Sequence, residues 1–395
     1  MLVSVGRALE AIPRMRPNMI LHAGPPITWE RMSAPLQGAV IGALLYEGVV
    51  GTEDEARDMA SRGRAIFEPA QEHRAICSVS GVISPSMPVC IIRDETYGNM
   101  MTLCALNEGP GRVLRYGAFK AEALERLKWV EKTLAPVLRQ GIAASGGIDL
   151  RSILSQALHM GDEGHQLTKA AMSLFIRTLA PHLVRTCPNH EMLAQVLSFL
   201  DGHNPFFQNL AMAAAKAALD AAHGIPGSRI VTAMAGNGTD FGIRVSGLGE
   251  SWFVAPVSQP GGMFLPGYSQ ADANPPIGDG PIMESYGLGA FALAGAPTVM
   301  AFIGGTAAEA REVTQEMYGI TQGESTAYTL PSLDLKGVPT GIDVQRVAAT
   351  GSAPWLNIEI IHKEPGTGAI GAGLWRAPLS PFQQAAQAMG QDQTT

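Results

Sequence analysis

The chain has 395 residues, which exceeds the size of one small core and predicts two or three domains. Its formal net charge of −7 excludes the basic surface with which proteins neutralise the phosphates of nucleic acids. Only 16% of the residues are charged and 45 are glycines, a composition that indicates surface buried against other subunits.

The four cysteines form neither CxxC pairs nor a disulfide framework, which is typical of a reducing compartment. The N-terminal residues lack the apolar core and cleavage site of a signal peptide, so we expect a cytoplasmic protein. No charged residue occurs between Glu284 and Glu309, a length that suffices for a membrane span. Because this stretch is rich in Gly and Ala and contains Pro297, we interpret it as a buried helix at 286–296 followed by a buried strand at 298–305.

The first part of the chain alternates strands with helices. Strands are predicted at 18–24 and 87–95, and an apolar run at 38–48 predicts a buried helix. The sequence TEDE, from Thr52 to Glu55, is a capping box that predicts the start of another helix. This alternation indicates an α/β domain over residues 1–116.

The middle of the chain, residues 117–226, predicts a helical subdomain. Apolar residues recur there at a spacing of three to four in five segments, which are 121–141, 150–160, 167–183, 191–201 and 206–224. Pro136 predicts a kink or break in the first segment. For the last segment we expect Asn204 as N-cap, Pro205 at the first helical position and Gly224 as C-cap.

The remainder, residues 227–395, returns to strands and glycine-rich turns. Strands are predicted at 228–236 and 355–363, and a second capping box from Thr306 to Glu309 predicts a helix. The predicted fold is therefore a multidomain α/β protein, with a helical subdomain between two mixed α/β domains.

The sequence GNGTDFGIR, residues 236–244, combines glycines with four polar side chains at the end of a predicted strand. We expect Asn237, Thr239 and Arg244 to bind a small anionic substrate, and Asp240 to orient the arginine or act as a base. The alternative is a structural turn in which Asp240 caps a backbone amide and Arg244 lies on a surface strand.

The sequence MGDEGH places Asp162 and His165 three residues apart near a predicted helix start, where both would share one face. A carboxylate beside an imidazole suits proton transfer. The alternative role of Asp162 is to cap the helix, and the residues alone leave both roles open. No spacing typical of a metal site is present.

Four further candidates lie in polar loops. Lys363 precedes a glycine-rich loop and would suit a phosphate, although a solvated pair with Glu364 explains it equally. His203 lies just ahead of a helix start, where amides attract anions. Arg115, in a loop that also holds Glu108, and Glu284, after a loop rich in Pro and Gly, are candidate ligand contacts.

Several of these segments together resemble the AllG/YlbE family. The matching motifs include GDEGH, NGTDFGIRVSG, DANPPIGDGPIMES, PTGID and HKEPGTGAIGAG, and the resemblance extends from about Pro17 to Pro378. It implies a three-domain, mixed α/β fold with a helical insert, which agrees with the boundaries above.

The resemblance also implies a function. Members are associated with an FdrA-like subunit, similar to the acyl-CoA synthetase pair, and with a third small subunit. Together these proteins are associated with oxamate carbamoyltransfer at the end of anaerobic allantoin degradation. The reaction interconverts oxalurate and phosphate with oxamate and carbamoyl phosphate, so no cofactor is implied beyond carbamoyl phosphate or phosphate as co-substrate. We therefore expect Asn237, Asp240 and Arg244 to bind substrate, Asp162 and His165 to transfer protons, and Lys363 to bind phosphate.

The chain departs from the family at two motifs. Where the family reads GDExHNRN, this chain has Gln166-Leu167-Thr168 after its histidine, and VGPMAG is replaced by residues 76–81. These departures leave open which ureido or amide compound is the substrate. Two other interpretations remain, namely a stand-alone amidase or lyase acting on a ureido compound and a non-catalytic scaffold for an FdrA-like partner.

Overall fold

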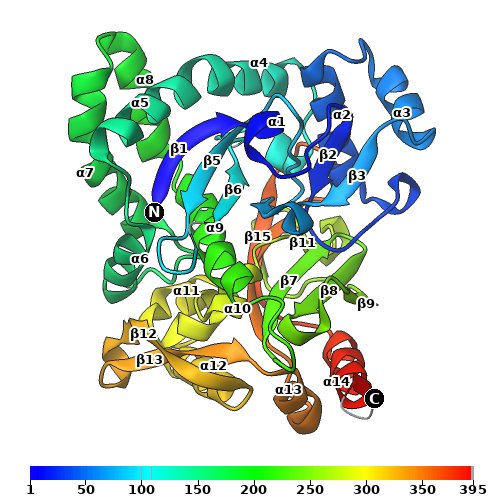
Figure 1. Cartoon of the computed structure of the whole chain (residues 1–395), viewed down its shortest axis with the longest axis vertical. Helices are drawn as coiled ribbons and strands as arrows, with labels where there is room; N and C mark the ends of the chain where they lie inside the picture. Colours follow the sequence, from blue (N-terminus) through cyan, green and yellow to red (C-terminus); the bar gives the residue numbers. More distant parts are fainter. Residues whose placement is uncertain (99, 108, 393–395) are drawn as a thin grey trace.

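The computed structural model describes residues 1–98, 100–107 and 109–392, so Glu108 of the expected anion-binding loop lies outside the described residues. The fold is mixed α/β with several separate sheets, as the sequence predicts (Figure 1). Within the described residues, no helix is both long and apolar enough to cross a lipid bilayer.

The described residues of the N-terminal part form two small sheets. The larger sheet has the order β1-β5-β6-β4, and β2 and β3 form a parallel pair. Its strands and helices are β1 (Leu2–Arg7), α1 (Ala8–Ala11), β2 (Met19–His22), α2 (Ala34–Glu47), α3 (Glu53–Ser61), β3 (Ile66–Pro69), β4 (Ala75–Ile76), β5 (Pro88–Arg93) and β6 (Met101–Ala105). The predicted capping box at the start of α3 is confirmed, because the Thr52 side chain accepts from the Glu55 amide while the Glu55 side chain accepts from the Thr52 amide.

Six α-helices follow without an intervening strand. They are α4 (Ala121–Trp129), α5 (Ala135–Ser145), α6 (Leu150–His159), α7 (Lys169–Thr186), α8 (His190–Gly202) and α9 (Pro205–Ala221). The predicted break near Pro136 is a π-helical turn, Val130–Leu134, that joins α4 to α5.

The predicted caps of α9 are partly wrong. Asn204 precedes Pro205 as expected, but its φ of −54° and ψ of −36° are helical, and its side chain makes no capping bond. A capping side chain needs extended backbone at that position, which explains the difference. At the other end Ala222 is the C-cap, and Gly224, with φ of 78°, lies two residues further on.

As far as residue 392, the C-terminal part contains three sheets, with the orders β11-β7-β8-β9, β10-β15-β14 and β12-β13. Its strands are β7 (Val231–Asn237), β8 (Asp240–Val245), β9 (Phe253–Pro256), β10 (Met263–Phe264), β11 (Ile277–Gly278), β12 (Thr321–Leu330), β13 (Lys336–Ile342), β14 (Trp355–Ile361) and β15 (Ala369–Arg376). Its helices are α10 (Ile282–Tyr286), α11 (Pro297–Phe302), α12 (Ala307–Tyr318), α13 (Val344–Thr350) and α14 (Ser380–Asp392).

The strand predicted at 298–305 is wrong, because α11 covers most of it. Pro297 occupies the first turn of that helix, where its fixed φ suits a helix start and its missing amide costs nothing. Val299 and Met300 bury their side chains in a small core shared with α12. Tertiary burial here overrides the β propensity of the segment.

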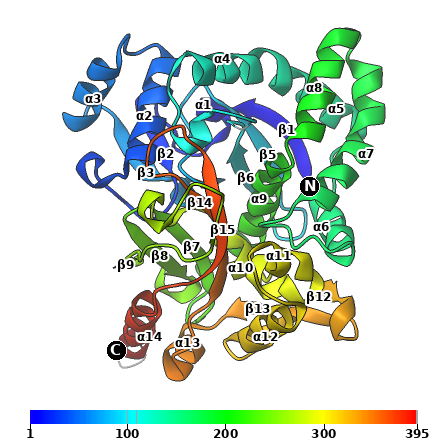
Figure 2. The same cartoon turned by 180° about the vertical axis from the view of Figure 1, so that it is seen from behind.

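Helix α9 occupies the centre of the molecule. It packs against β4, β5 and β6 on one side and against β7 and α10 on the other (Figure 1). Figure 2 shows β15 running along the middle of the opposite face, beside β14. The boundaries 1–116, 117–226 and 227–395 stay a prediction, because the largest hydrophobic cluster joins residues of all three parts.

Candidate functional site

A small cavity lies where the three parts of the chain meet. Ser78 and Val79 line it from the N-terminal part, and Gln208 lines it from α9. His165 enters from the loop between α6 and α7, and Asn357 enters from β14. The cavity volume is ≈ 40 Å³, which leaves room for only a few water molecules.

A buried carboxylate holds the imidazole of His165 at this cavity. The Nδ1 atom of His165 lies 2.9 Å from Oε1 of Glu284, a residue of α10 with no exposed surface. The same oxygen accepts from the amides of Ala290 and Asn357, each at 3.0 Å. Because the glutamate is fixed by backbone donors, it orients the ring and directs Nε2 away from itself, as the acid of a catalytic dyad does.

Two glycines allow this close arrangement. A Cβ atom on Gly280 would lie 2.5 Å from Nε2 of His165, and Gly280 itself lines the cavity. A Cβ atom on Gly289 would lie 2.3 Å from Oε1 of Glu284. Neither residue has space for a side chain, so the backbone approaches the imidazole and the carboxylate directly.

The electrostatic surroundings favour the charged form of His165. Burial opposes protonation, but the nearby carboxylates, above all Glu284, outweigh it and raise the pKa of His165. Burial, assisted by Asp162, also raises the pKa of Glu163 to about 7. The carboxylate of Glu163 accepts from Nδ2 of Asn357 at 3.0 Å and from the Leu167 amide at 3.0 Å. Glu163 and His165 therefore both have pKa values raised by their buried, carboxylate-rich surroundings.

Arg115 contacts two residues that line the cavity. Its guanidinium donates to Glu359 at 2.7 Å and to Gln208 at 3.2 Å, and both acceptors line the cavity. The Tyr116 hydroxyl donates to the other oxygen of Glu359 at 3.0 Å. The structure thus brings Arg115, His165 and Glu284, three of the predicted site residues, into one neighbourhood.

The loop that closes the N-terminal side of the cavity is strained. Val79 has φ of 52°, a left-handed conformation that is costly for a β-branched residue. Asp279 secures this loop, because its carboxylate accepts from the amides of Cys77 at 2.8 Å and Gly24 at 3.1 Å. Burial raises the pKa of Asp279 to about 6.

Asp162 does not share a helix face with His165, because both lie in the loop that precedes α7. The two oxygens of Asp162 accept from the amides of Gly164 and Ala171, each at 3.0 Å, and Ala171 is in the first turn of α7. These contacts are those of a residue that caps the start of α7. Burial raises the pKa of Asp162 to about 6.

The turn between β7 and β8 is a structural turn, as in the alternative, but Asn237 and not Asp240 accepts from its backbone amides. Oδ1 of Asn237 accepts from the amides of Thr239 at 3.0 Å and Asp240 at 2.7 Å, which is an Asx-turn. The Thr239 hydroxyl donates to the Arg31 carbonyl at 2.7 Å, and the Asp240 carboxylate pairs with the Arg31 guanidinium at 2.7 Å. These three residues join the N-terminal and C-terminal parts, and none of them lines the cavity.

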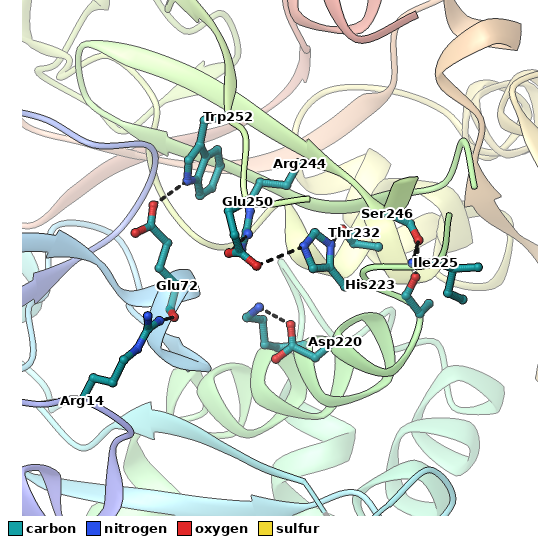
Figure 3. Close-up of polar contacts among 12 residues, drawn as sticks. Arg14, Glu72, Asp220, His223, Ile225, Thr232, Arg244, Ser246, Glu250 and Trp252 are labelled. Carbon is teal, nitrogen blue, oxygen red and sulfur yellow. Dashed lines mark hydrogen bonds and ion pairs between the residues drawn. The ribbon is translucent and has the colours of Figure 1, made fainter. Parts of the chain in front are cut away.

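Arg244 lies in a second polar cluster (Figure 3). Its guanidinium pairs with the carboxylate of Glu250 and lies 5.8 Å from the centre of the Trp252 ring. The cluster also contains His223 and Asp220, from the end of α9 and just beyond it. Arg244 is 4% exposed, so the alternative of a surface strand is wrong for this side chain.

Lys363 and His203 are also outside the cavity lining. The exposed Lys363 side chain donates to the carbonyl of Ala271 at 2.7 Å. His203 is buried, and its ring contacts that of Phe199 at 5.7 Å between ring centres.

Sequence reasoning missed the roles of Glu163, Asn357 and Glu359. A signal was present for the last two, because polar residues at alternate positions of an otherwise apolar strand share one face of the sheet. For Glu163 the sequence carries only the local signal of an acidic residue near a helix start, where it interacts favourably with the helix dipole. Its role depends on Asn357, a partner almost two hundred residues away.

Comparison with known proteins identifies clear relatives. A family model described as oxamate carbamoyltransferase subunit AllG matches residues 66–280. The oxamate carbamoyltransferase subunit AllG of Escherichia coli K12 is 43% identical over 374 residues, which is 94% of this chain and 89% of that protein. The uncharacterized protein YahG of the same organism is 42% identical over 384 residues, 97% of this chain and 81% of that protein.

A solved structure has the same fold. It is the crystal structure of a conserved protein of unknown function from Enterococcus faecalis V583, with a TM-score of 0.97 and 45% sequence identity. The match covers 99% of this chain and 94% of that chain.

Proposed function

This chain belongs to the AllG family of oxamate carbamoyltransferase subunits, and we propose that it carries a proton-transfer site of a carbamoyltransferase complex. The reaction interconverts a ureido carboxylate plus phosphate with an oxamate-like amide plus carbamoyl phosphate. Within this complex, the partners of the chain are an FdrA-like subunit and a third small subunit. The single observation that carries the proposal is the His165–Glu284 pair at the cavity where the three parts of the chain meet.

The chemistry needs one proton to move at the amide nitrogen. When a phosphate oxygen attacks the ureido carbonyl carbon, a new C–O bond forms and the C–N bond to the amide breaks. The departing nitrogen then needs a proton, which the imidazolium of His165 donates from Nε2. In the opposite direction the neutral imidazole takes that proton from the attacking amide. A raised pKa of His165 keeps the donor form populated near neutral pH.

An unused acceptor supports a substrate with an amide or ureido group. Asn357 lines the cavity and donates through Nδ2 to Glu163, while its Oδ1 atom has no hydrogen-bond partner among the described residues. A buried acceptor without a partner is costly, and a substrate N–H group would satisfy it. Because the cavity holds only a few waters, the reactants require its walls to separate, and the strained turn at Val79 is one wall.

The test is phosphate release from carbamoyl phosphate by this chain purified together with the FdrA-like subunit and the third small subunit. Oxamate and related amides are supplied in turn, and release that depends on one amide identifies the acceptor. We expect His165→Gln to reduce turnover by at least a hundred-fold, the usual contribution of general acid–base catalysis. His190→Gln, which changes an exposed histidine at the start of α8, is the matched control and should retain full turnover.

Full turnover by the His165→Gln complex would remove the assigned role. Turnover of a ureido compound without phosphate, by this chain alone, would favour the amidase or lyase interpretation. Absence of release from an assembled complex with every amide would favour the scaffold.

A further inference from the structure

A second cluster of polar side chains lies at the far end of α9 from the cavity. It contains Arg244 on β8, His223 after α9, and Glu250 in the turn between β8 and β9 (Figure 3). The carboxylate of Glu250 lies between the two other side chains. One of its oxygens pairs with the Arg244 guanidinium, and the other is 4.0 Å from Nε2 of His223.

The side chains of Arg244 and His223 each have a nitrogen atom that makes no hydrogen bond within the described residues. Nε of Arg244 and Nε2 of His223 are both buried and have no hydrogen-bond partner among the described residues. Nδ1 of His223 lies 2.7 Å from the Thr232 hydroxyl. When that hydroxyl donates to Nδ1, the ring proton resides on Nε2, which then faces Glu250 as a donor.

The side chain of Glu250 differs from the rest of the cluster in its exposure. It is 80% exposed, whereas the Arg244 side chain is only 5% exposed. Gly249, with φ of 59°, directly precedes it in the turn. A carboxylate that approaches a buried guanidinium from solvent in this way can be replaced by another anion without a rearrangement of the core.

The charges of the cluster favour an anion in the place of Glu250. Lys216 is buried, and its ammonium pairs with the carboxylate of Asp220, so these two charges cancel. Burial and Arg244 lower the pKa of His223, which keeps that ring neutral. Without the Glu250 carboxylate, the buried Arg244 guanidinium would lose its ion pair, and a buried unpaired charge requires a counter-ion.

We propose that Arg244 and His223 form an oxyanion-binding site, separate from the His165 cavity, in which the Glu250 carboxylate occupies the ligand position. The ligand class is a small phosphate or carboxylate anion, which Arg244 binds through its guanidinium and His223 through Nε2. This inference concerns binding alone and does not depend on the carbamoyltransfer reaction proposed above.

The test is calorimetric titration of the purified full-length chain with inorganic phosphate and, separately, with oxamate at constant ionic strength. Glu250→Gln removes the competing charge from an exposed position, so we expect it to bind the preferred anion about five-fold more tightly than the wild type. Glu125→Gln changes an exposed glutamate of α4 and should leave the affinity unchanged. The anion with the tighter binding distinguishes a phosphate site from a carboxylate site.

A second variant tests the role of the Arg244 guanidinium. Arg244→Gln should abolish the tighter binding when combined with Glu250→Gln, and circular dichroism checks that the doubly substituted chain is folded. Equal affinities of the wild type, Glu250→Gln and Glu125→Gln for both anions would overturn the proposal. So would the absence of binding to a Glu250→Gln chain that circular dichroism shows to be folded. Since no turnover is measured, these outcomes are independent of whether the His165 site is catalytic.

Discussion

Nδ1 of His165 lies 2.9 Å from Oε1 of Glu284, although the two residues are 119 positions apart in the chain. The first belongs to a loop of the helical block and the second to α10 of the C-terminal part. Their contact therefore exists only when those two parts are packed together. Any motion that separates them also releases the imidazole from the carboxylate that orients it.

We expect Glu284→Gln to lower the pKa of His165, because it removes the negative charge that most favours the imidazolium. The pKa is measured by NMR of the protein with labelled histidine. In the direction that forms carbamoyl phosphate, turnover needs the imidazolium form of His165. The turnover rate should therefore begin to fall at a lower pH in the variant than in the wild type. Identical titration curves and pH profiles for both proteins would contradict the orienting role of Glu284.

We expect Gly280→Ala to reduce turnover strongly, because its Cβ atom would lie 2.5 Å from Nε2 of His165 and force the ring to move. A displacement of about 1 Å from the reacting geometry costs on the order of a hundred-fold in rate. Gly261→Ala is the matched control, since a Cβ atom there meets nothing within 4 Å. The test compares the steady-state rates of complexes that contain Gly280→Ala or Gly261→Ala. Equal rates would show that the reacting atoms do not lie next to Nε2 of His165.

We expect Asp162→Ala to lower the free energy of unfolding by about 1–3 kcal/mol, because two buried amides lose their acceptor. Urea denaturation measures this loss. The turnover of the folded variant, corrected for the folded fraction, should stay within a few-fold of the wild type. A loss as large as that of His165→Gln, without loss of stability, would instead support a catalytic role for Asp162.

We expect Asp279 to make the stability of the protein depend on pH in the acidic range. Burial raises its pKa from 3.8 to about 6, so the folded state holds a proton that the unfolded state has lost. The resulting stabilisation is complete below about pH 3.8 and is lost as the pH rises through 6, with an amplitude on the order of 3 kcal/mol.

This contribution is isolated by comparison with Asp279→Asn, which cannot titrate. The difference in unfolding free energy between wild type and variant should shrink from pH 4 to pH 6 and remain constant above it. A difference that is independent of pH over this range would show that the carboxyl group keeps its ordinary pKa.

We expect Lys363→Ala to leave turnover nearly unchanged. The Lys363 side chain is exposed and donates to the Ala271 carbonyl, and it does not line the cavity. Rates measured at limiting and saturating phosphate provide the test, because a phosphate-binding lysine would raise the KM for phosphate by more than ten-fold when removed.

The residues by themselves determined the elements whose stabilising contacts are local. The capping boxes at Thr52 and Thr306 are present as predicted, because each satisfies backbone amides three residues away. The helical periodicity of the middle of the chain, and the long apolar strands β7 and β14, were likewise readable from a few consecutive residues. The family resemblance, carried by motifs spread over the chain, was confirmed by the relatives found.

Only the tertiary structure decided what depends on distant partners. Burial against α12 made residues 297–302 a helix where their composition favoured a strand. Packing of α10 against the loop before α7 gave His165 its carboxylate, and folding of β14 beside them gave Glu163 its amide partner. The same packing left Asp162 as a cap. A side chain's chemistry is set by the charges and solvent that surround it, and those come from residues that sequence spacing cannot bring together.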